Sequence, residues 1–568
     1  MKKLILLLIA APFFVVAQNP LAIPTTLTGT NMMLTLQEGT TQFFPGTITN
    51  TMGANGSLLG PTLILQKGDF LNMTVDNQLS DTTTMHWHGL HVAPEDDGGP
   101  HSVIPSNTTW NPQFTVMDKA GTYWYHPHLH MHTDEHVSKG IAGMILVRDA
   151  EEATLNLPLT YGVDEFPLVL QTKGFDANNQ ILVHTESDSV VMVNGTIDPV
   201  VDFPAQVVRL RVLNGSSQRI YEVGFSDNRS FSLIGTDGGL LAAPVNITRY
   251  RMAPGQRADI LVDLSSDLGQ NIQLMSYASE FFPGNYGSYQ PSLNASFTPS
   301  LVGYSDNPLN GADFQLLAIN VVAQTANPIT TIPSTLANFT PLTEGMENKT
   351  RTLLFNSVGP MGDLNGPYTI GGASFDMAVI NETIPLDNIE VWSLTNQTPI
   401  AHPFHIHDIQ FFILDISGDP PPPELEGFND VVLVPAGGRT VRFIAKFNDF
   451  ADDTIPFMYH CHMLTHEDMG MMGQFIVSET VGINDNYQEI KNLSIYPNPT
   501  QGKISIEGQG LKGVSSIVFR NTNGALIKEI NITSTSILTI DVPNEKGIYL
   551  LEITNDKGEK MLRKIVRY

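Results

Sequence analysis

The chain has 568 residues, a length that suggests about three to four domains of ~150 residues each. Hydrophobic residues make up 42% of the chain and charged residues 15%, which permits buried cores and excludes a largely disordered protein. The net charge of −27 argues against a nucleic-acid-binding protein, because such proteins need basic patches to displace the counterions of phosphate.

The first residues predict a targeting segment. Lys2 and Lys3 give a positive start, the run from Leu4 to Val16 is almost wholly apolar, and Ala17 offers a small residue for cleavage. The apolar run is shorter than the roughly 20 residues of a membrane span. We therefore expect a signal peptide at residues 1–17 and an exported protein without a membrane span.

Short runs rich in β-branched residues follow along the chain, and Gly, Pro, Asn and Asp separate them. Examples are Thr62 to Gln66, Val207 to Leu213 and Thr440 to Ala445. This pattern is typical of β-sandwiches, so we predict an all-β fold. The spacing of the runs predicts three units, which we place at residues 20–150, 155–325 and 335–480.

Two proline-containing segments and a change of charge mark the remaining organisation. The stretch from Ala326 to Pro341 predicts a connector between the second and third units, and Pro420 to Pro423 predicts a stiff surface loop. Residues 491–568 carry a net charge of +4, whereas the rest of the chain carries −31. This change, after the polar stretch Asn484 to Glu489, predicts a small separate β-sandwich at residues 491–568.

The histidines give the clearest functional signal. Nine of the 16 lie between His86 and His136, six lie between His402 and His466, and only His184 stands apart. Within the two windows they form four His-x-His pairs: His86/His88, His126/His128, His405/His407 and His460/His462. Residues i and i+2 of a strand face the same side, so each pair should present two imidazoles, which suit copper. Eight ligands from the first and third units predict a cluster of several metal ions between those units.

Cys461 is the only cysteine and lies between His460 and His462, so it should point away from them. A blue-copper site needs one cysteine, two histidines and a weak axial ligand, often methionine. His402, His466 and Met471 are the nearby residues of those types. Cys461 would then join this site to the cluster through its two flanking histidines. Four coppers together hold the four electrons that reduce dioxygen to two waters, while the protein sets geometry and access.

Two acidic residues stand close to these ligands in the sequence. Asp97 follows His88 by nine residues, and Glu467 directly follows His466. Carboxylates beside a metal–oxygen cluster can relay protons or orient bound water. From spacing alone, either residue could be merely a solvated acid.

Four segments together resemble the copper motifs of the multicopper oxidases, over roughly residues 25 to 480. They are His86-Trp87-His88-Gly89, Trp124-Tyr125-His126-Pro127-His128, His402-Pro403-Phe404-His405-Ile406-His407, and His460-Cys461-His462 through to Met471. The middle unit also resembles that family, at Val193-Asn194-Gly195 and Thr236-Asp237-Gly238-Gly239. The resemblance implies three cupredoxin domains, each a Greek-key β-sandwich.

The resemblance also implies four copper ions per chain and a role for each ligand. The type 1 copper would be held by His402, Cys461 and His466 with Met471 axial, the type 2 copper by His86 and His405, and the type 3 pair by His88, His126, His128, His407, His460 and His462. Asp97 and Glu467 match acidic positions beside the ligands in bacterial copper-efflux-type oxidases.

The expected reaction is the oxidation of a small reducing substrate by dioxygen, and the leading hypothesis is a phenolic, laccase-like donor. That hypothesis predicts an open groove over His402 or His466. The alternative is a cuprous or ferrous metallo-oxidase. Copper-efflux oxidases carry Met and Asp before the His-Pro-Phe-His motif, where this chain has Thr398-Pro399-Ile400-Ala401. A copper-binding or electron-transfer module without turnover is a third possibility, but it would need only the Cys461 site.

Several histidines and methionines outside the motifs leave the cuprous alternative open. Each could bind cuprous ion or simply pack or face solvent. They are His130, Met131, His132, His136, Met463, Met469 and Met472.

The tail resembles the C-terminal sorting domain of type IX secretion cargo. The matching features are Tyr496-Pro497-Asn498-Pro499-Thr500, Gly547-Ile548-Tyr549 and the basic stretch from Lys560 to Arg567. This resemblance implies a Gram-negative host, the type IX secretion machinery as a partner, and a secreted or cell-surface location.

Overall fold

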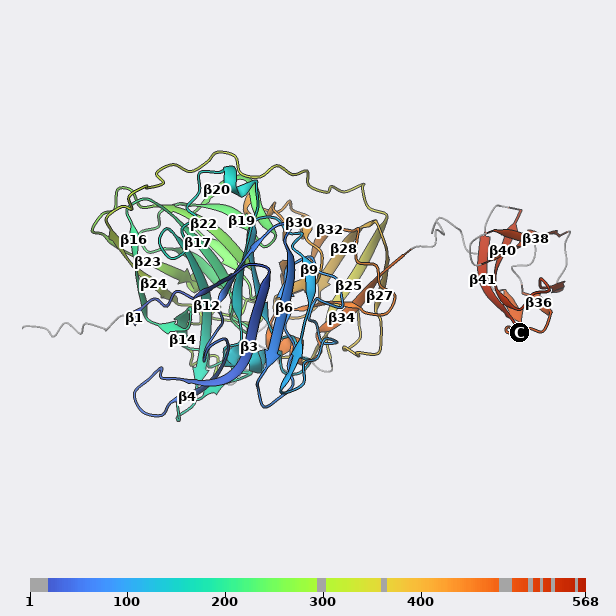
Figure 1. The fold of residues 1–568 in the computed structure, drawn as a ribbon, viewed down its shortest axis with the longest axis horizontal. Helices are drawn as coiled ribbons and strands as arrows, with labels where there is room; N and C mark the ends of the chain where they lie inside the picture. The colour runs from blue at the N-terminus through green and yellow to red at the C-terminus, as the bar shows by residue number, and fades with distance from the viewer. Residues whose placement is uncertain are drawn as a thin grey trace, which may run out of the picture. The chain divides into compact units, whose positions relative to one another are not determined.

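The computed structural model describes residues 19–293, 303–358, 365–479, 493–508, 514–521, 525–532, 537–556 and 560–568. The expected signal peptide at residues 1–17 and the polar stretch 484–489 lie outside the described residues. The chain divides into two compact units, Met1–Glu479 and Thr480–Tyr568. Strands dominate both units, as Figure 1 shows, so the all-β prediction is confirmed.

The first part of the larger unit contains two five-stranded sheets. In β6, buried Leu71, Met73 and Val75 alternate with less buried neighbours, which is the pattern of a strand with one face on a core. One sheet has the order β2 (Thr26–Thr28), β5 (Thr62–Gln66), β11 (Gly143–Arg148), β10 (Gly121–His126) and β7 (His86–His88). The other has the order β4 (Thr49–Ala54), β3 (Asn31–Thr41), β6 (Phe70–Asn77) and β8 (Thr108–Trp110), with β9 (Gln113–Thr115) also paired to β6.

The middle part contains an eight-stranded and a six-stranded sheet around the largest apolar core of the described chain. The first sheet runs β15 (Thr196–Ile197), β14 (Val190–Val193), β12 (Glu165–Phe175), β17 (Val207–Asn214), β22 (Arg257–Asp263), β19 (Phe231–Thr236) and β20 (Gly239–Ile247), with β13 (Ile181–Leu182) on β12. The second runs β1 (Asn19–Pro20), β16 (Pro199–Pro204), β24 (Asp313–Val322), β23 (Asn271–Tyr277), β18 (Tyr221–Phe225) and β21 (Tyr250–Met252).

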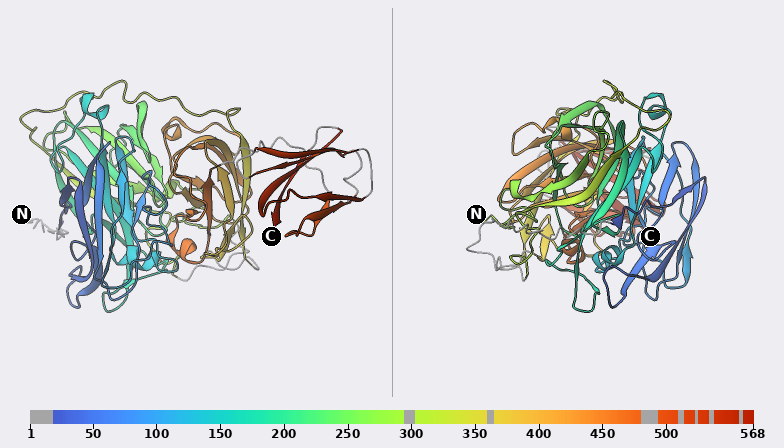
Figure 2. Two further views of the ribbon diagram at one scale, coloured as in Figure 1. Left: turned by 45° about the vertical axis from the view of Figure 1, so that its right-hand side comes forward. Right: turned by 90° about the vertical axis from the view of Figure 1, so that its left-hand side faces the viewer.

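The last part of the larger unit again contains two five-stranded sheets. One has the order β26 (Tyr368–Ile370), β25 (Lys349–Ser357), β28 (Asn388–Asn396), β32 (Arg439–Phe447) and β30 (Phe411–Ile416). The other has the order β27 (Glu382–Pro385), β34 (Met472–Ser478), β33 (Phe457–Cys461), β29 (His402–Ile406) and β31 (Val431–Val434). The two further views in Figure 2 show all three strand-built parts packed against one another. The exact limits of the three predicted units stay a prediction, because residues 19–479 form one compact unit.

Helices are few and short in the described chain. They are α1 (Thr133–Lys139), α2 (Leu464–Asp468) and the 3₁₀ turns η1 (Glu152–Thr154), η2 (Ala278–Glu280) and η3 (Pro423–Leu425). Among the described residues, no helix has the length and apolar character needed to cross a bilayer. The segment between β24 and β25 crosses the unit as an extended strap, visible at the top of Figure 1 in yellow-green.

The smaller unit contains two sheets around a core of its own, which agrees with the small separate β-sandwich predicted for the tail. Asn498, in the motif that resembles a sorting signal, donates from its amide to Lys564 O at 2.6 Å and accepts from Val566 N at 2.9 Å. The motif thereby covers part of the edge of the last strand, which would otherwise offer unpaired backbone groups. The sheets run β35 (Ser494–Tyr496), β36 (Lys503–Glu507) and β39 (Ile537–Asp541), and β38 (Leu526–Asn531), β37 (Val514–Arg520), β40 (Gly547–Asn555) and β41 (Lys560–Arg567).

Candidate metal centre

Neighbouring strands carry the His-x-His pairs in each of two sheets. In the first, β7 pairs with β10 so that His86 lies opposite His126. In the other, β29 pairs with β33 so that His405 lies opposite His460. The expectation that every pair lies within a strand was wrong. Only His86 and His88 do, whereas the second histidine of each other pair follows the end of its strand.

The structure brings the eight paired histidines together in one buried cluster. Each has a relative exposure of 1% or less. His88 Nδ1 lies 3.4 Å from His126 Nε2 and 3.2 Å from His462 Nε2. His128 Nε2 lies 3.1 Å from His460 Nε2, and a nitrogen of His407 approaches both. The ring nitrogens therefore converge in two groups of three.

His86 and His405, the two cluster histidines outside these groups of three, add two more nitrogens. The Nε2 atoms of His86, His405 and His407 are buried and have no hydrogen-bond partner among the described residues. A buried polar atom without a partner is costly unless something satisfies it. A metal ion among these nitrogens would do so, and an all-imidazole donor set suits copper.

Burial favours the neutral form of six of the eight imidazoles, and a metal ligand must be neutral. It lowers the pKa of His88, His126, His405 and His407 well below the ordinary value, and neighbouring histidines lower it further. It also lowers the pKa of His128 and His462 to about 3.

Backbone carbonyls fix which nitrogen faces the cluster. Asp97 O lies 2.9 Å from His86 Nδ1, and Asp430 O lies 2.9 Å from His405 Nδ1. Because a carbonyl only accepts, each Nδ1 carries the hydrogen and each Nε2 keeps its lone pair for a metal. Main-chain carbonyls lie in the same way at 2.8 Å from His126 Nδ1 and 3.1 Å from His460 Nδ1.

Asp97 and Glu467 lie against the outer side of this cluster. Asp97 Oδ2 is 2.8 Å from His407 Nδ1. The two oxygens of Glu467 are 3.3 Å from His128 Nδ1 and 3.1 Å from His460 Nδ1. Burial alone would raise the pKa of Glu467, but His128 and His460 lower it below the ordinary value. Both carboxylates are thus in contact with cluster histidines rather than with bulk solvent.

Cys461 points away from its flanking histidines, into a second site. Its Sγ lies 3.4 Å from His402 Nδ1 and 3.6 Å from His466 Nδ1, and these two nitrogens are 3.2 Å apart. A point equidistant from the three atoms is about 2 Å from each, close to an imidazole–metal bond length. Burial raises the pKa of the Cys461 thiol, so a bound cation would be needed to hold the thiolate. Met471 is buried in the same apolar core as Cys461.

The surroundings of His402 and His466 correct one expectation. Both histidines are fully buried, so neither offers the exposed edge that an open groove would provide. The ring of Tyr368 packs against both, with centroids at 4.8 and 4.9 Å. Thr398 Oγ1 lies 2.8 Å from His402 Nε2.

The histidines and methionines outside the motifs are spread between core and surface. His136, Met463 and Met472 are buried, whereas Met131 and Met469 are 63% and 43% exposed. His130 packs against Phe375 at 5.1 Å, and His132 is partly exposed beside Glu135. His184, which stands apart in the sequence, lies between the carboxylates of Asp134 and Asp468.

Sequence reasoning missed three residues: two that touch the histidines of the two sites, and one that binds such a partner. Asp430 Oδ1 lies 3.2 Å from His88 Nε2, and Arg257 binds the same carboxylate. The third is Thr398, next to His402. No motif or spacing marks them as ligand partners, since threonine, aspartate and arginine are common and these contacts depend on the tertiary fold.

Comparisons with known proteins agree with this geometry. Residues 35–152 and 338–481 match the family described as multicopper oxidase, and residues 494–567 match the secretion system C-terminal sorting domain. Multicopper oxidase mco of Staphylococcus haemolyticus is 32% identical over 79% of this chain and 88% of its own length. Cell division protein FtsP of Sodalis glossinidius is 30% identical over 81% of this chain and 93% of its own. A solved structure of a bacterial laccase-like multi-copper oxidase CueO from Ochrobactrum sp. superposes with a TM-score of 0.70 and 32% identity, covering 81% of this chain and 100% of that one.

Proposed function

The chain belongs to the multicopper oxidase family, and from this we propose that it is an oxidase that takes single electrons from a small donor at the Cys461 site and reduces dioxygen to water at the histidine cluster. The observation that carries the proposal is the position of Cys461. Its Sγ contacts His402 and His466, while the adjacent His460 and His462 lie in the cluster. One short stretch of covalent bonds therefore joins the two sites.

Each group of donors has a proposed occupant. Copper, when bound, supplies one-electron redox chemistry and the binding of dioxygen. His402, Cys461 and His466 would hold one type 1 ion, with Met471 as a further, weak ligand. His86 and His405 would hold the type 2 ion, and the two groups of three nitrogens would hold the type 3 pair: His88, His126 and His462, and His128, His407 and His460.

Asp97 and Glu467 would hold and deliver the protons that water formation consumes. Asp97 contacts His407, and Glu467 reaches both His128 and His460, so each carboxylate borders the cluster. The hydrogen bond from Asp97 also fixes the orientation of the His407 ring, and Glu467 lies close enough to the other two rings to favour one orientation of each. We therefore assign them proton transfer as well as ligand positioning.

The preferred donor is a small phenol or other aromatic molecule. The laccase-like oxidase from Ochrobactrum sp., which shares this fold, has oxidase activity towards lignin model compounds. Because His402 and His466 are buried, an electron from such a donor would have to cross the covering side chains. Tyr368, in contact with both rings, is one of these.

A cuprous or ferrous ion is the second candidate donor. The closed cover over His402 and His466 favours it, because an ion that binds at the surface needs no groove. Met131 and Met469 offer exposed thioethers, which are soft ligands for cuprous ion.

A role without turnover is the third possibility, since some relatives carry the name of a cell division protein. This chain keeps Cys461 and all eight cluster histidines, and the eight are unnecessary for simple electron transfer. We also propose that the sorting domain carries the oxidase through type IX secretion to the surface or exterior of a Gram-negative cell. The match at residues 494–567 supports that location.

Oxygen uptake by the copper-loaded protein tests the proposed function. We expect uptake with a phenol or cuprous ion as donor. His407→Ala should abolish it while the blue absorption of the Cys461 site remains. His101→Ala is the matched control, because His101 hydrogen-bonds Gln474 rather than a cluster histidine, and it should keep full uptake. Unchanged uptake by His407→Ala would overturn the cluster assignment. A faster rate with cuprous ion than with the phenol would favour the metallo-oxidase.

A further inference from the structure

Arg257, the first residue of β22, lies fully buried behind the histidine cluster. Its Nε donates to Thr122 O at 3.0 Å, and its two terminal nitrogens donate to Gly255 O at 3.0 Å and Asp237 O at 2.8 Å. The rest of the guanidinium faces Asp430, on the segment that leads into β31. One side chain of the middle sheets thus bonds to segments from all three parts of the larger unit.

Asp430 is held by Arg257 and by the backbone around it. Its Oδ1 accepts from Arg257 Nη1 at 2.7 Å, and its Oδ2 accepts from Nη2. Asp237 Oδ2 accepts from the backbone N–H of Val431 at 3.2 Å, which fixes the chain beside Asp430. A two-pronged guanidinium–carboxylate pair of this kind gives a defined orientation as well as attraction.

The same carboxylate touches two cluster histidines. Asp430 Oδ1 lies 3.2 Å from His88 Nε2 and 3.6 Å from His405 Nδ1, and Asp430 O accepts from that same Nδ1 at 2.9 Å. Arg257 engages both oxygens of the carboxylate, and the two histidine nitrogens nearest to Asp430 lie where N–H groups can donate to it.

This contact decides which nitrogen of His88 faces the cluster. A carboxylate paired with a guanidinium accepts, so Nε2 of His88 carries the hydrogen and Nδ1 keeps the lone pair. Nδ1 is the atom that lies beside His126 Nε2 and His462 Nε2. His86 and His405 show the opposite arrangement, in which a carbonyl binds Nδ1 and leaves Nε2 for the cluster.

The segment before Arg257 also touches the cluster. Gly255 has a φ of +85°, and a Cβ there would lie 2.9 Å from the ring of His462. Only glycine allows the backbone to approach that ring so closely in this conformation. Gly255 and Arg257 thus bring one segment of the middle sheets against both His462 and Asp430.

We propose that Arg257 and Asp430 form a positioning pair, which selects Nδ1 of His88 for copper and holds His88 and His405 in place. Through this pair the middle sheets act on the cluster, although they supply none of its eight histidines. This inference rests on the proposed copper cluster and adds the residues that order it. Replacing the partner of a metal-binding histidine typically weakens metal binding about 10- to 100-fold.

Two substitutions test the pair. Asp430→Asn keeps the shape but loses the charge and replaces one carboxylate oxygen with an NH2 group, so that an N–H donor faces the N–H donors of Arg257 or of His88. Arg257→Lys keeps the charge and loses the two-pronged geometry, and it is the milder variant should Asp430→Asn fail to fold. Arg209→Lys is the matched control, since Arg209 is equally buried in the middle sheets and binds Asp259 in the same two-pronged way.

Competition between each copper-loaded protein and a chelator would give the copper affinity. Visible and electron paramagnetic resonance spectra would distinguish copper at the Cys461 site from copper in the cluster. We expect about a 10- to 100-fold loss of affinity at the cluster in both variants, an unchanged Cys461 spectrum, and no selective loss in Arg209→Lys. Unaltered cluster binding in the variants would overturn the pair. So would a parallel loss of the Cys461 site, or the same selective loss in the control. A wild-type protein without cluster copper would instead refute the proposed function.

Discussion

The imidazole of His402 can turn only one nitrogen toward Cys461, and Thr398 determines which one. The Thr398 hydroxyl donates to Ile400 O at 2.9 Å, so its single hydrogen is used. It must therefore accept from His402 Nε2–H, 2.8 Å away, and this leaves the Nδ1 lone pair for the site.

Thr398→Val should disturb the Cys461 site without touching a proposed ligand. The buried His402 Nε2–H would lose its partner, at a cost of about 1–3 kcal/mol in stability. The imidazole would become less basic, so we expect a higher reduction potential and an altered visible spectrum. Thr398→Ser keeps the hydroxyl and should behave as the wild type. Redox titration followed by absorption checks this, and an unchanged potential in Thr398→Val would contradict it.

The residues that converge on the two sites could be found from the sequence, whereas their partners could not. Cysteine and paired histidines are rare, and their clustering within two segments of the chain is improbable unless they share a function. Thr398, Asp430 and Arg257 have common side chains at ordinary spacings. Their roles arise from contacts such as Arg257 to Asp430, which lie 173 positions apart in the chain.

At the scale of elements, the short helix α2 connects the two sites to α1. It carries His466 and Glu467 and ends at Asp468. Asp468 accepts from the backbone N–H groups of Thr133 at 2.9 Å and Asp134 at 3.0 Å, at the start of α1. The N-cap residue of α1 itself makes no side-chain capping bond. Asp468 therefore caps α1 from another part of the chain.

Asp468→Ala should remove this cap and loosen α2. We expect a loss of about 0.5–2 kcal/mol in stability, as for other lost caps, together with a broadened spectrum of the Cys461 site. Asp468→Asn retains one acceptor and should lose less. Thermal unfolding with the visible spectrum recorded in parallel would measure both. If Asp468→Ala melted like the wild type with the same spectrum, Asp468 would not link the two helices.

The strand pattern was predictable, but the turns and helices were not. Alternating and fully apolar runs mark the strands, because one or both faces are buried. Helices α1 and α2 span seven and five residues, too few for a helical period to emerge. The ends of β10, β29 and β33, which leave His128, His407 and His462 just outside the strands, could not be foreseen either.

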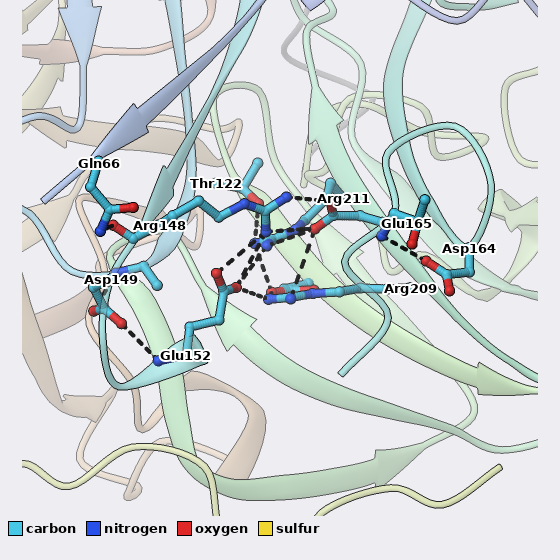
Figure 3. A network of polar contacts seen from close by, with 12 residues as sticks. Gln66, Thr122, Arg148, Asp149, Glu152, Asp164, Glu165, Arg209 and Arg211 are labelled. Atoms are coloured by element: carbon cyan, nitrogen blue, oxygen red, sulfur yellow. Dashed lines mark hydrogen bonds and ion pairs between the residues drawn. The ribbon is translucent and has the colours of Figure 1, made fainter. Parts of the chain in front are cut away.

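At the scale of the whole molecule, a buried ion network joins the first and middle parts of the larger unit. Arg211 Nη2 contacts Glu152, its Nε contacts Glu165 and its Nη1 contacts Asp259, each at 2.9 Å. Arg148 and Arg209 complete the network, which Figure 3 shows in close view. The charges balance only while all partners are present.

Arg211→Met should destabilise the larger unit strongly, because it leaves Glu152, Glu165 and Asp259 buried with too little positive charge. We expect a loss of about 3–5 kcal/mol in denaturant unfolding. Arg229→Met is the matched control: Arg229 pairs with Asp227 and Asp267 in a partly exposed position, and its loss should cost at most about 1 kcal/mol. Equal effects of the two substitutions would contradict the role of the network.

The location of the cluster between the first and third parts of the larger unit could be predicted from the positions of the histidine pairs. The contribution of the middle part could not, since it supplies no cluster histidine and acts through Arg257, Gly255 and the buried ion network. Such contacts join distant segments and leave no local pattern.

X-ray diffraction at the copper absorption edge, from crystals of the copper-loaded protein, tests the central claim most directly. We predict four anomalous peaks: one between His402, Cys461 and His466, and three among the eight cluster histidines, with Nδ1 of His88 and Nε2 of the others facing the metal. Copper at the Cys461 site with none in the cluster, or copper only at exposed residues such as Met131 and Met469, would contradict it.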